Sequence, residues 1–522
     1  MSRAIVVGGG IAGLATAALL ARDGHRVTLL EQREALGGRA GTWEAEGFRF
    51  DTGPSWYLMP EVFEHFFRLM GTSAADELDL VGLDPGYRVF FEGRPGSLDV
   101  PAGRQRAAAL FESIEPGAGA RLEAYLDSAD ETARLALDHF LYSDFSSPRD
   151  LLTRDVLRRS GRLGTLLLQS LERFIGRRFA DPRLRQVLGY PAVFLGTSPG
   201  AAPSMYHLMS RYDLELGVDY PMGGFGEVIG AVERLAVRAG VRLRTGVRVD
   251  RIVIDAGRVT GVDATDASGR ALHLPADLVV SAGDGHHADT VLLPPEGRTR
   301  SDAAWARTDP GPSAVLALLG VRGRLPELRH HNLLFTEDWD ENFRLVLGPG
   351  RGVPDPASLY ACMPSATDPS VAPDGHENLF VLVPVPADPG LGAGGIGGTG
   401  DPEVERIADR AIAQIAGWAG VPDLADRVVV RRTIGPADFE SWFHSYRGSA
   451  LGPAHVLRQS AFLRGRTTSR DIEGLYFAGA TTVPGIGLPM CLISAELVAK
   501  AVRGDRRSGP LPEPAAHAEA TA

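Results

Sequence analysis

The chain begins with MSRAIVVGGGIAGLATAALLARDGHRVTLLEQREALGGR, residues 1–39. An apolar run at 4–7 predicts a buried strand, and an Ala/Leu-rich run at 14–22 predicts a helix. Between them, the residues GGGIAG at 8–13 fit the pattern G-x-G-x-x-G. A second apolar strand follows at 27–30. This order of elements predicts the βαβ unit of a Rossmann-type α/β fold.

Each residue of the pattern has a physical reason. Gly8 allows the tight turn, Gly10 lets a pyrophosphate approach the backbone, and Gly13 lets helix and strand pack closely. The helix N-terminus offers free N–H groups to the phosphates. Glu31 ends the second strand, 18 residues after Gly13, where its carboxylate can accept hydrogen bonds from both ribose hydroxyls. Its negative charge disfavours a 2′-phosphate and therefore NADP.

The composition excludes several classes of protein. The 522 residues are 44% hydrophobic and 23% charged, which predicts a globular chain of two or three subregions. The net charge of −11 argues against a nucleic-acid binder. Two separate cysteines, Cys362 and Cys491, cannot form a disulfide framework or a Cys-based metal site, so a reducing cytoplasmic setting and no metal are expected. No signal peptide and no apolar run of 18 residues occur.

Further along the chain, the composition predicts a division into regions. Residues 57–222 favour helices, and apolar runs at 313–321, 345–347 and 379–383 favour strands of a second sheet. The expected domains are a dinucleotide-binding domain (1–100, 223–300 and 460–504), a helical region (101–222), a substrate-domain sheet (301–459) with a flexible glycine-rich linker at 387–402, and a disordered tail (505–522).

One segment is basic in an otherwise acidic protein. Residues 149–185 contain ten arginines and four acids. Leu163, Leu167, Leu171 and Phe174 fall at helical spacing, which predicts an amphipathic helix. Such a helix either docks on an anionic membrane surface or packs its apolar face in the core with the basic face in water. The segment by itself slightly favours the second interpretation.

Several motifs beyond the first βαβ unit resemble one family. They are Gly37-Gly38-Arg39, residues 51–56 (DTGPSW), residues 220–226 (YPMGGFG), residues 435–439 (GPADF) and residues 479–490 (GATTVPGIGLPM). Together with the N-terminal fingerprint, they resemble bacterial phytoene desaturases, the carotenoid-desaturase branch of the FAD-dependent amine oxidase superfamily. The resemblance covers nearly the whole chain. It implies a Rossmann-type FAD domain built from discontinuous segments, a mixed-sheet substrate domain and a helical lid or membrane-facing region.

The resemblance also implies the residues that bind FAD. They are Gly8, Gly10, Gly13, Glu31, Gln32, Gly38, Arg39, Gly53, Pro54, Ser55, Val249, Gly479, Ala480, Gly487 and Leu488. No catalytic residue is assigned, because Val483 stands where many relatives have a histidine. Asp219, Asp438 and His444 lie near family motifs but are expected to be structural, as are His286 and His287.

The function that the resemblance implies is stepwise desaturation of a C40 polyene, phytoene towards lycopene, by hydride transfer to flavin. The expected partners are this long apolar polyene, the anionic inner face of the cell membrane as a peripheral contact, and oxygen or a quinone as electron acceptor. A carotenoid isomerase, ketolase, later-step desaturase or saturase, and an amine oxidase, remain alternatives on the same fold. A non-catalytic prenyl-lipid carrier is a further alternative, but it would not need the intact glycine set.

Overall fold

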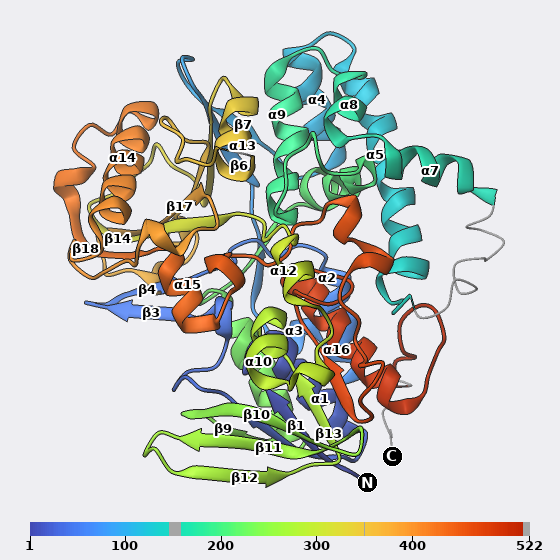
Figure 1. The fold of residues 1–522 in the computed structure, drawn as a ribbon. Coiled ribbons are helices and arrows are strands. Elements are labelled where there is room, and N and C mark those ends of the chain that lie inside the picture. Colours follow the sequence, from blue (N-terminus) through green and yellow to red (C-terminus); the bar gives the residue numbers. More distant parts are fainter. Residues whose placement is uncertain (146–157, 349, 515–522) are drawn as a thin grey trace, which may run out of the picture.

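The computed structural model describes residues 1–145, 158–348 and 350–514. A parallel sheet with its helices forms one body, and a larger mixed sheet with helix α14 (Pro402–Ala419) forms a second (Figure 1). A group of helices forms a third body, which lies above the parallel sheet and beside the mixed sheet in this view. The chain passes between these bodies several times. The segments of each body are therefore far apart in the sequence.

The parallel sheet has the strand order β19-β13-β1-β2-β9. Its strands are β1 (Arg3–Val7), β2 (Arg26–Leu30), β9 (Arg242–Arg244), β13 (Leu278–Ser281) and β19 (Leu475–Phe477), and all neighbours are parallel. The helices α1 (Ile11–Arg22), α10 (Phe225–Arg238) and α16 (Leu488–Arg503) share one core with α2 (Pro60–Leu69). The predicted βαβ unit is thus the centre of the sheet, and the predicted discontinuous Rossmann-type domain is present.

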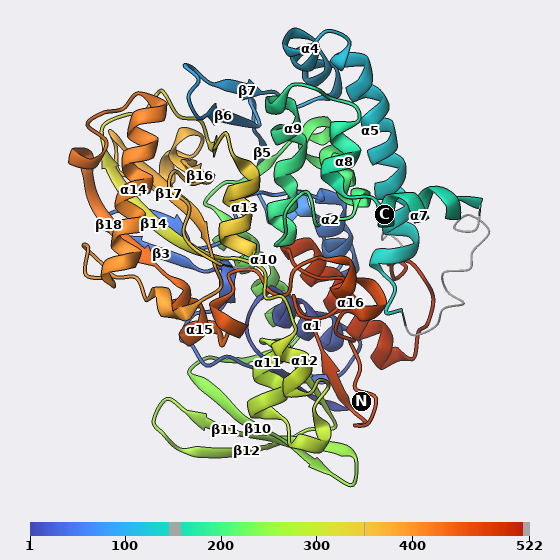
Figure 2. The same ribbon diagram turned by 45° about the horizontal axis from the view of Figure 1, so that its top comes forward.

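Smaller elements surround this sheet. A three-stranded antiparallel sheet packs on it through a shared apolar core (Figure 2); its strands are β10 (Val247–Asp255), β11 (Arg258–Asp266) and β12 (Ala271–Pro275). Strands β3 (Thr42–Ala45) and β4 (Phe48–Asp51) form a hairpin. The short helices α3 (Ala74–Glu77), α11 (Gly285–His287), α12 (Asp302–Ala306) and α15 (Pro436–Phe443) complete the loops.

The mixed sheet has the order β18-β14-β17-β16-β15-β6-β7. Its strands are β6 (Tyr87–Phe91), β7 (Leu98–Val100), β14 (Ser313–Arg322), β15 (His331–Phe335), β16 (Leu359–Cys362), β17 (His376–Val385) and β18 (Val428–Ile434). Only the β6–β15 pair is parallel. The strand predicted at 345–347 is wrong, because these residues end helix α13 (Trp339–Leu347), which buries Val346.

The region expected to be helical is only partly so. Its main helices are α4 (Arg104–Ile114), α5 (Ala118–Leu135), α7 (Ser160–Leu168), α8 (Leu171–Gly176) and α9 (Pro182–Gly189). Strands interrupt it, since β6 and β7 join the mixed sheet and β5 (Leu80–Gly82) pairs with β8 (Asp219–Pro221). Among the described residues, no helix has the length and apolar character needed to cross a membrane.

The predicted amphipathic helix over the basic segment does not form as one helix. Helix α7 ends at Leu168, and Ser170 caps the separate helix α8. Of the expected stripe, Leu163 and Phe174 are buried in the protein, whereas Leu167 is 38% exposed. Arg149 and Arg154 lie outside the described residues. Most apolar side chains of the stripe therefore pack in the hydrophobic core, and the basic residues lie on several short elements.

The glycine-rich stretch at 387–402 differs from the flexible linker that was predicted. Gly394 N–H donates to Asp438 Oδ2 at 2.6 Å, and Gly395 N–H donates to Thr433 Oγ1 at 2.8 Å. A Cβ at Gly394 would lie 2.0 Å from the carbonyl oxygen of Thr433. Gly394 and Gly395 therefore let this loop pack directly against strand β18.

The C-terminal segment also differs from the expected disordered tail. Lys500 Nζ donates to the carbonyl oxygens of Arg507 at 2.6 Å and Gly509 at 2.7 Å. Leu511 is buried, and its N–H donates to the buried Glu496 carboxylate. Residues 505–514 thus pack on α16, because one buried ammonium binds their carbonyl groups. Residues 515–522 lie outside the described part of the chain.

We expect Gly394→Ala to lower the free energy of unfolding by about 2 kcal/mol, because the added methyl group collides with the Thr433 carbonyl. The control is Gly417→Ala in helix α14, where an added Cβ meets no atom within 4 Å. That variant should be as stable as the parent or more stable, because alanine favours a helix. Chemical denaturation measures both. An unchanged Gly394→Ala midpoint would show that the loop is not held tightly.

Candidate functional site

The carboxyl ends of the parallel strands meet at one edge of the sheet, where open α/β sheets bind ligands. Gly8 follows β1, Glu31 follows β2, and Gly479 follows β19 shortly after its end. Strand β13 ends beside β1, and its next residues reach Gly8. The chain goes from β1 to β2 on one side and reaches β13 only later on the other. In open α/β sheets such a reversal of strand order is where a ligand binds, and we call this place the crevice.

The first glycine loop leaves space in front of helix α1. Gly8 has φ +106°, which side chains rarely adopt, and a Cβ at Gly13 would lie 2.0 Å from the Gly8 carbonyl oxygen. Among the described residues, and leaving out the adjacent backbone, the only atom within 4 Å of a Cβ added at Gly10 is the Gly37 carbonyl oxygen, 4.0 Å away. Gly8 and Gly13 are therefore required by the fold. Gly10 faces open space at the N-terminus of α1, where a diphosphate is favoured.

Glu31 and Gln32 close the side of this space. The Glu31 carboxylate is 8% exposed and accepts hydrogen bonds from Gly9 N–H at 2.7 Å and Arg33 N–H at 2.8 Å. Its main chain also pairs with Val247 of β10, two residues from Val249. The Gln32 side chain already has a hydrogen-bond partner, since its amide oxygen lies 3.0 Å from His444 Nε2. Glu31 is thus held beside the glycine loop, while Gln32 connects it to the segment after α15.

A second glycine pair brings Arg39 to the loop. Gly37 N–H donates to the Gly9 carbonyl at 2.9 Å, and Gly38 packs against Gly10. The Arg39 guanidinium donates to Ser445 Oγ at 2.5 Å. Burial lowers the pKa of Arg39, and the nearby Asp284 carboxylate opposes this shift. Arg39 Nε is buried without a partner among the described residues. An unsatisfied buried donor of this kind is expected of a group that awaits a ligand.

The motif at 51–56 continues along the same crevice. A Cβ at Gly53 would lie 2.1 Å from the Arg39 carbonyl oxygen, so Gly53 packs directly against the residue that follows the second glycine pair. Ser55 Oγ lies 2.7 Å from the hydroxyl of Tyr360, and Trp56 stacks on His331 with ring centroids 4.3 Å apart. This motif therefore joins the parallel-sheet body to the mixed sheet.

The first residue of that motif has a different role. The Asp51 carboxylate accepts hydrogen bonds from Phe225 N–H at 2.8 Å and Gly226 N–H at 3.2 Å, which caps helix α10. Burial raises its pKa to about 6. The motif and the segment at 220–226, which are far apart in the chain, are thus held together by one carboxylate.

Residues 479–490, which we call the closing segment, follow strand β19 and lead into helix α16 at the same edge of the sheet. Gly479 has φ +105° and donates from its N–H to Ser494 Oγ at 3.0 Å. Gly487, with φ +112°, precedes helix α16, whose first turn at Leu488 is only partly buried. The free N–H groups of this first turn and the positive end of the helix dipole favour a negatively charged group. The segment thus provides a second helix N-terminus, in addition to that of α1.

Two residues that the sequence did not single out hold this segment. His455 Nε2 accepts a hydrogen bond from Ile486 N–H at 3.2 Å. Arg464 donates to the carbonyl oxygens of Ala480 at 2.6 Å and Thr482 at 3.2 Å. Both side chains are buried. Neither residue is part of a recognisable motif, so only the folded chain identifies them.

The polar candidates near the motifs have structural partners. Asp438 accepts hydrogen bonds from Gly435 N–H at 2.8 Å and Gly394 N–H at 2.6 Å. His444 lies against Gln32 and stacks on His287 at 3.9 Å between ring centroids. Burial and the neighbouring imidazoles lower the pKa of His287 to about 4, so that it is neutral at pH 7. His286 packs on Trp305. Burial raises the pKa of Asp219, which lies in strand β8.

Among the described residues, one cluster of side chains has donor atoms close enough together to bind a metal ion. The donor atoms of His330, His331 and Cys362 lie within 4.8 Å of one another in the buried part of the mixed sheet. His331 Nδ1 already lies 2.7 Å from the Tyr360 hydroxyl, and His330 Nδ1 lies 2.8 Å from Thr367 Oγ1. Burial raises the pKa of the Cys362 thiol. These contacts explain the cluster without a metal ion, as part of the side-chain packing around Trp56.

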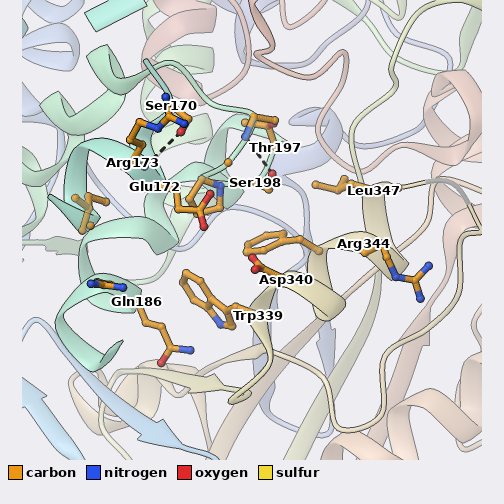
Figure 3. Close-up of a pocket in the computed structure, with 18 of the residues that line it drawn as sticks. Ser170, Glu172, Arg173, Gln186, Thr197, Ser198, Trp339, Asp340, Arg344 and Leu347 are labelled. Carbon is orange, nitrogen blue, oxygen red and sulfur yellow. Dashed lines mark hydrogen bonds between the residues drawn. The ribbon is translucent and has the colours of Figure 1, made fainter. Parts of the chain in front are cut away.

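A groove of about 1390 Å³ lies between helices α8 and α9 on one side and α13 on the other (Figure 3). Trp339 and Leu347 form an apolar wall, and Gln186 and Arg344 add polar groups. None of the expected FAD-binding residues lines it. Aromatic rings connect it to the crevice: Trp339 packs on Phe335, Phe335 on Tyr190 and Tyr190 on Trp56, with centroids 4.9, 6.1 and 6.0 Å apart.

Comparison with known proteins agrees with this site. A family profile described as flavin containing amine oxidoreductase matches residues 11–503. The chain is 42% identical over 500 residues to a carotenoid 3,4-desaturase of Haloarcula japonica, covering 96% of this chain and 98% of that protein. It is 36% identical over 504 residues to a zeta-carotene-forming phytoene desaturase of Myxococcus xanthus, covering 95% and 93%.

Solved structures support the fold. Cyclohexylamine oxidase from Brevibacterium oxydans IH-35A superposes with a TM-score of 0.57 at 16% identity, covering 97% of this chain and 99% of that chain. The open space at Gly10, the unsatisfied Arg39 donor and the two helix N-termini fit a dinucleotide that carries a flavin. From the family profile, which spans nearly the whole chain, and from its long relatives, we conclude that this chain belongs to the flavin containing amine oxidoreductase family and that FAD is its cofactor.

Proposed function

We propose that this protein is a carotenoid desaturase, which removes two hydrogens from adjacent carbons of a C40 polyene, phytoene towards lycopene. The observation that carries the proposal is the similarity over nearly the full length to two proteins named as carotenoid desaturases. The intact glycine loops and Arg39 support an enzyme over a lipid carrier, since a carrier needs no diphosphate site.

We further propose how the chain holds its cofactor. Gly8, Gly10, Gly13 and Gly38 shape the space for the diphosphate, and Glu31 binds the ribose. Residues 53–55, 479–480 and 487–488 surround the flavin end, and Val249 and Gln32 lie toward the adenosine end. When bound, FAD supplies the acceptor for a hydride, and a proton leaves the neighbouring carbon of the polyene. The protein contributes position and electrostatics.

One relative favours a second candidate within the same reaction class. The protein at 42% identity is named a carotenoid 3,4-desaturase. By analogy, this chain would act on a polyene that is already partly conjugated, such as lycopene, and would introduce a double bond near its end. The two candidates differ in substrate and share the site.

The two electrons must leave the reduced cofactor. The described residues hold one dinucleotide loop of the G-x-G-x-x-G type in a strand–turn–helix setting, and the second glycine-rich stretch packs on strand β18. We therefore propose oxygen or a quinone as the acceptor. A quinone would reach the protein from the membrane, as would the apolar polyene.

A surface between 457 and 466 fits this membrane contact better than the basic segment that the sequence suggested. We name it the 457–466 surface: Leu457, Phe462 and Leu463 are 48%, 51% and 62% exposed, and Arg458 and Arg466 are exposed beside them. Apolar side chains flanked by arginines suit an anionic lipid surface. The next residue inward is Arg464, which holds the closing segment of the cofactor site. We propose peripheral docking there, at the inner face of the cell membrane.

The cofactor assignment predicts that Gly10→Val abolishes flavin binding, because the valine side chain would occupy the open space before helix α1. The measurement is the visible spectrum of the purified protein and its FAD content. Gly417→Val, on the exposed face of α14, is the control that should remain yellow. A Gly10→Val protein with full FAD occupancy would refute the placement of the diphosphate.

The substrate assignment predicts coloured products when the FAD-loaded protein is incubated with phytoene in liposomes, under air or with a quinone without oxygen. Chromatography of the pigments gives the number of double bonds formed. Parallel incubation with lycopene tests the second candidate, since a 3,4-desaturase leaves phytoene unchanged and extends lycopene. If neither polyene changes while FAD remains bound, the desaturase proposal fails.

The membrane proposal predicts that the double substitution Phe462→Ser and Leu463→Ser weakens sedimentation with anionic liposomes. Loss of two exposed apolar side chains removes about 3 kcal/mol of favourable transfer to lipid. The control is Ile396→Ser with Val429→Ser, which changes two exposed apolar residues by strand β18 and should sediment as the parent does. Equal sedimentation of all three proteins would exclude the 457–466 surface.

A further inference from the structure

Arg464 is a buried cation without an acidic partner. It is 4% exposed, and no carboxylate lies within 4.0 Å of its guanidinium in the described part of the chain. Its charge is met by main-chain carbonyl oxygens of Pro453, Gln459, Ala480 and Thr482 at 2.6 to 3.3 Å. Burial lowers its pKa to about 10, so it stays charged at neutral pH. Buried charges are normally paired with an opposite charge.

The described residues around Arg464 supply no negative charge at neutral pH. His455, whose ring supports the same segment, is neutral, because burial and Arg464 hold its pKa well below the usual range. Arg300 adds a second positive charge nearby and helps to lower the pKa of Arg464. The hydroxyl of Tyr206 lies against His455 and is protonated at neutral pH, since burial raises its pKa. Among the residues that the structure describes, Arg464 therefore has no counter-ion.

Arg464 lies next to the segment that faces the cofactor. Two of its four carbonyl partners belong to residues 479–490, and a Cβ at Gly485 would lie 3.2 Å from its guanidinium carbon. Cys491, in the first turn of α16, is close to both Arg39 and Arg464, which both lower the pKa of its thiol against the effect of burial. Both arginines therefore lie near the first turn of α16.

We propose that Arg464 is a positioning residue that serves the reduced flavin: it fixes residues 480–482 by their carbonyl groups, and its unpaired charge stabilises the negative charge that the flavin acquires on reduction. This inference rests on the proposed placement of FAD. It explains why a buried arginine lies at this position without a carboxylate partner. A carboxylate there would cancel the field that favours hydride acceptance.

The test uses sulfite, which adds to flavin N5 and leaves a negative charge on the ring without any carotenoid. Arg464→Met should bind sulfite about tenfold more weakly than the parent, the effect expected when one nearby unit charge is lost from a partly screened site. The same factor corresponds to a two-electron midpoint potential about 30 mV more negative. Arg464→Gln is the second neutral variant if Arg464→Met does not fold.

Two controls separate the charge from the packing. Arg464→Lys keeps the charge and loses most carbonyl contacts, so its sulfite affinity should stay close to that of the parent. Arg470→Met removes an exposed charge from the same stretch and should change nothing. If Met and Lys variants lose sulfite affinity equally, the role is structural and the electrostatic proposal falls. Weaker FAD binding with unchanged sulfite affinity would assign the charge to the diphosphate and likewise overturn it.

The outcomes for the cofactor placement itself are separate. A parent protein that carries no flavin would refute the placement of FAD, whatever the variants do. A yellow parent whose neutral variants bind sulfite as tightly as it does would refute only the role of Arg464.

Discussion

The structure depends on the close contact between helix α1 and the turn that follows strand β1. The Gly13 backbone approaches the Gly8 carbonyl so closely that an added Cβ would lie 2.0 Å away. This contact sets the direction of α1, and the helix N-terminus then faces the crevice beside β13. Gly37 and Gly38 pack against the same loop and bring Arg39 into position. Any larger residue at Gly13 would move the helix, the loop and the arginine together.

The site is assembled from segments that are separated in the amino-acid sequence. Residues 8–13, 37–39, 53–56 and 479–488 meet only because β1, β2, β13 and β19 lie in one parallel sheet. Buried polar groups hold the segments in register: Asp51 caps helix α10, Asp284 and Ser445 lie by Arg39, and Arg464 binds the carbonyls of the closing segment. Each is a group whose desolvation is costly unless its partner is in place. The site therefore forms with the fold and not before it.

Local pattern predicted the parts of this fold where sequence neighbours decide the structure. The βαβ unit and the strands at 313–321 and 379–383 were predicted, since their apolar runs are long, and the structure forms strands at both places. The strand predicted at 345–347 is part of a helix, because its short apolar run suits either element. The prediction of a single amphipathic helix is wrong, because a break at Ser170 separates Leu167 from Phe174.

The sequence by itself determined the cofactor class and the family, because the glycines, Glu31 and Arg39 must occur at fixed spacings for a dinucleotide to touch the backbone. Only the tertiary structure decided which polar residues serve the site. Asp438 and His444 lie near motifs yet are used in caps and stacking, whereas Arg464 and His455 belong to no motif and support the closing segment. The reason is physical: a motif records what a ligand requires of the nearby backbone, while the charge around it comes from residues distant in the chain.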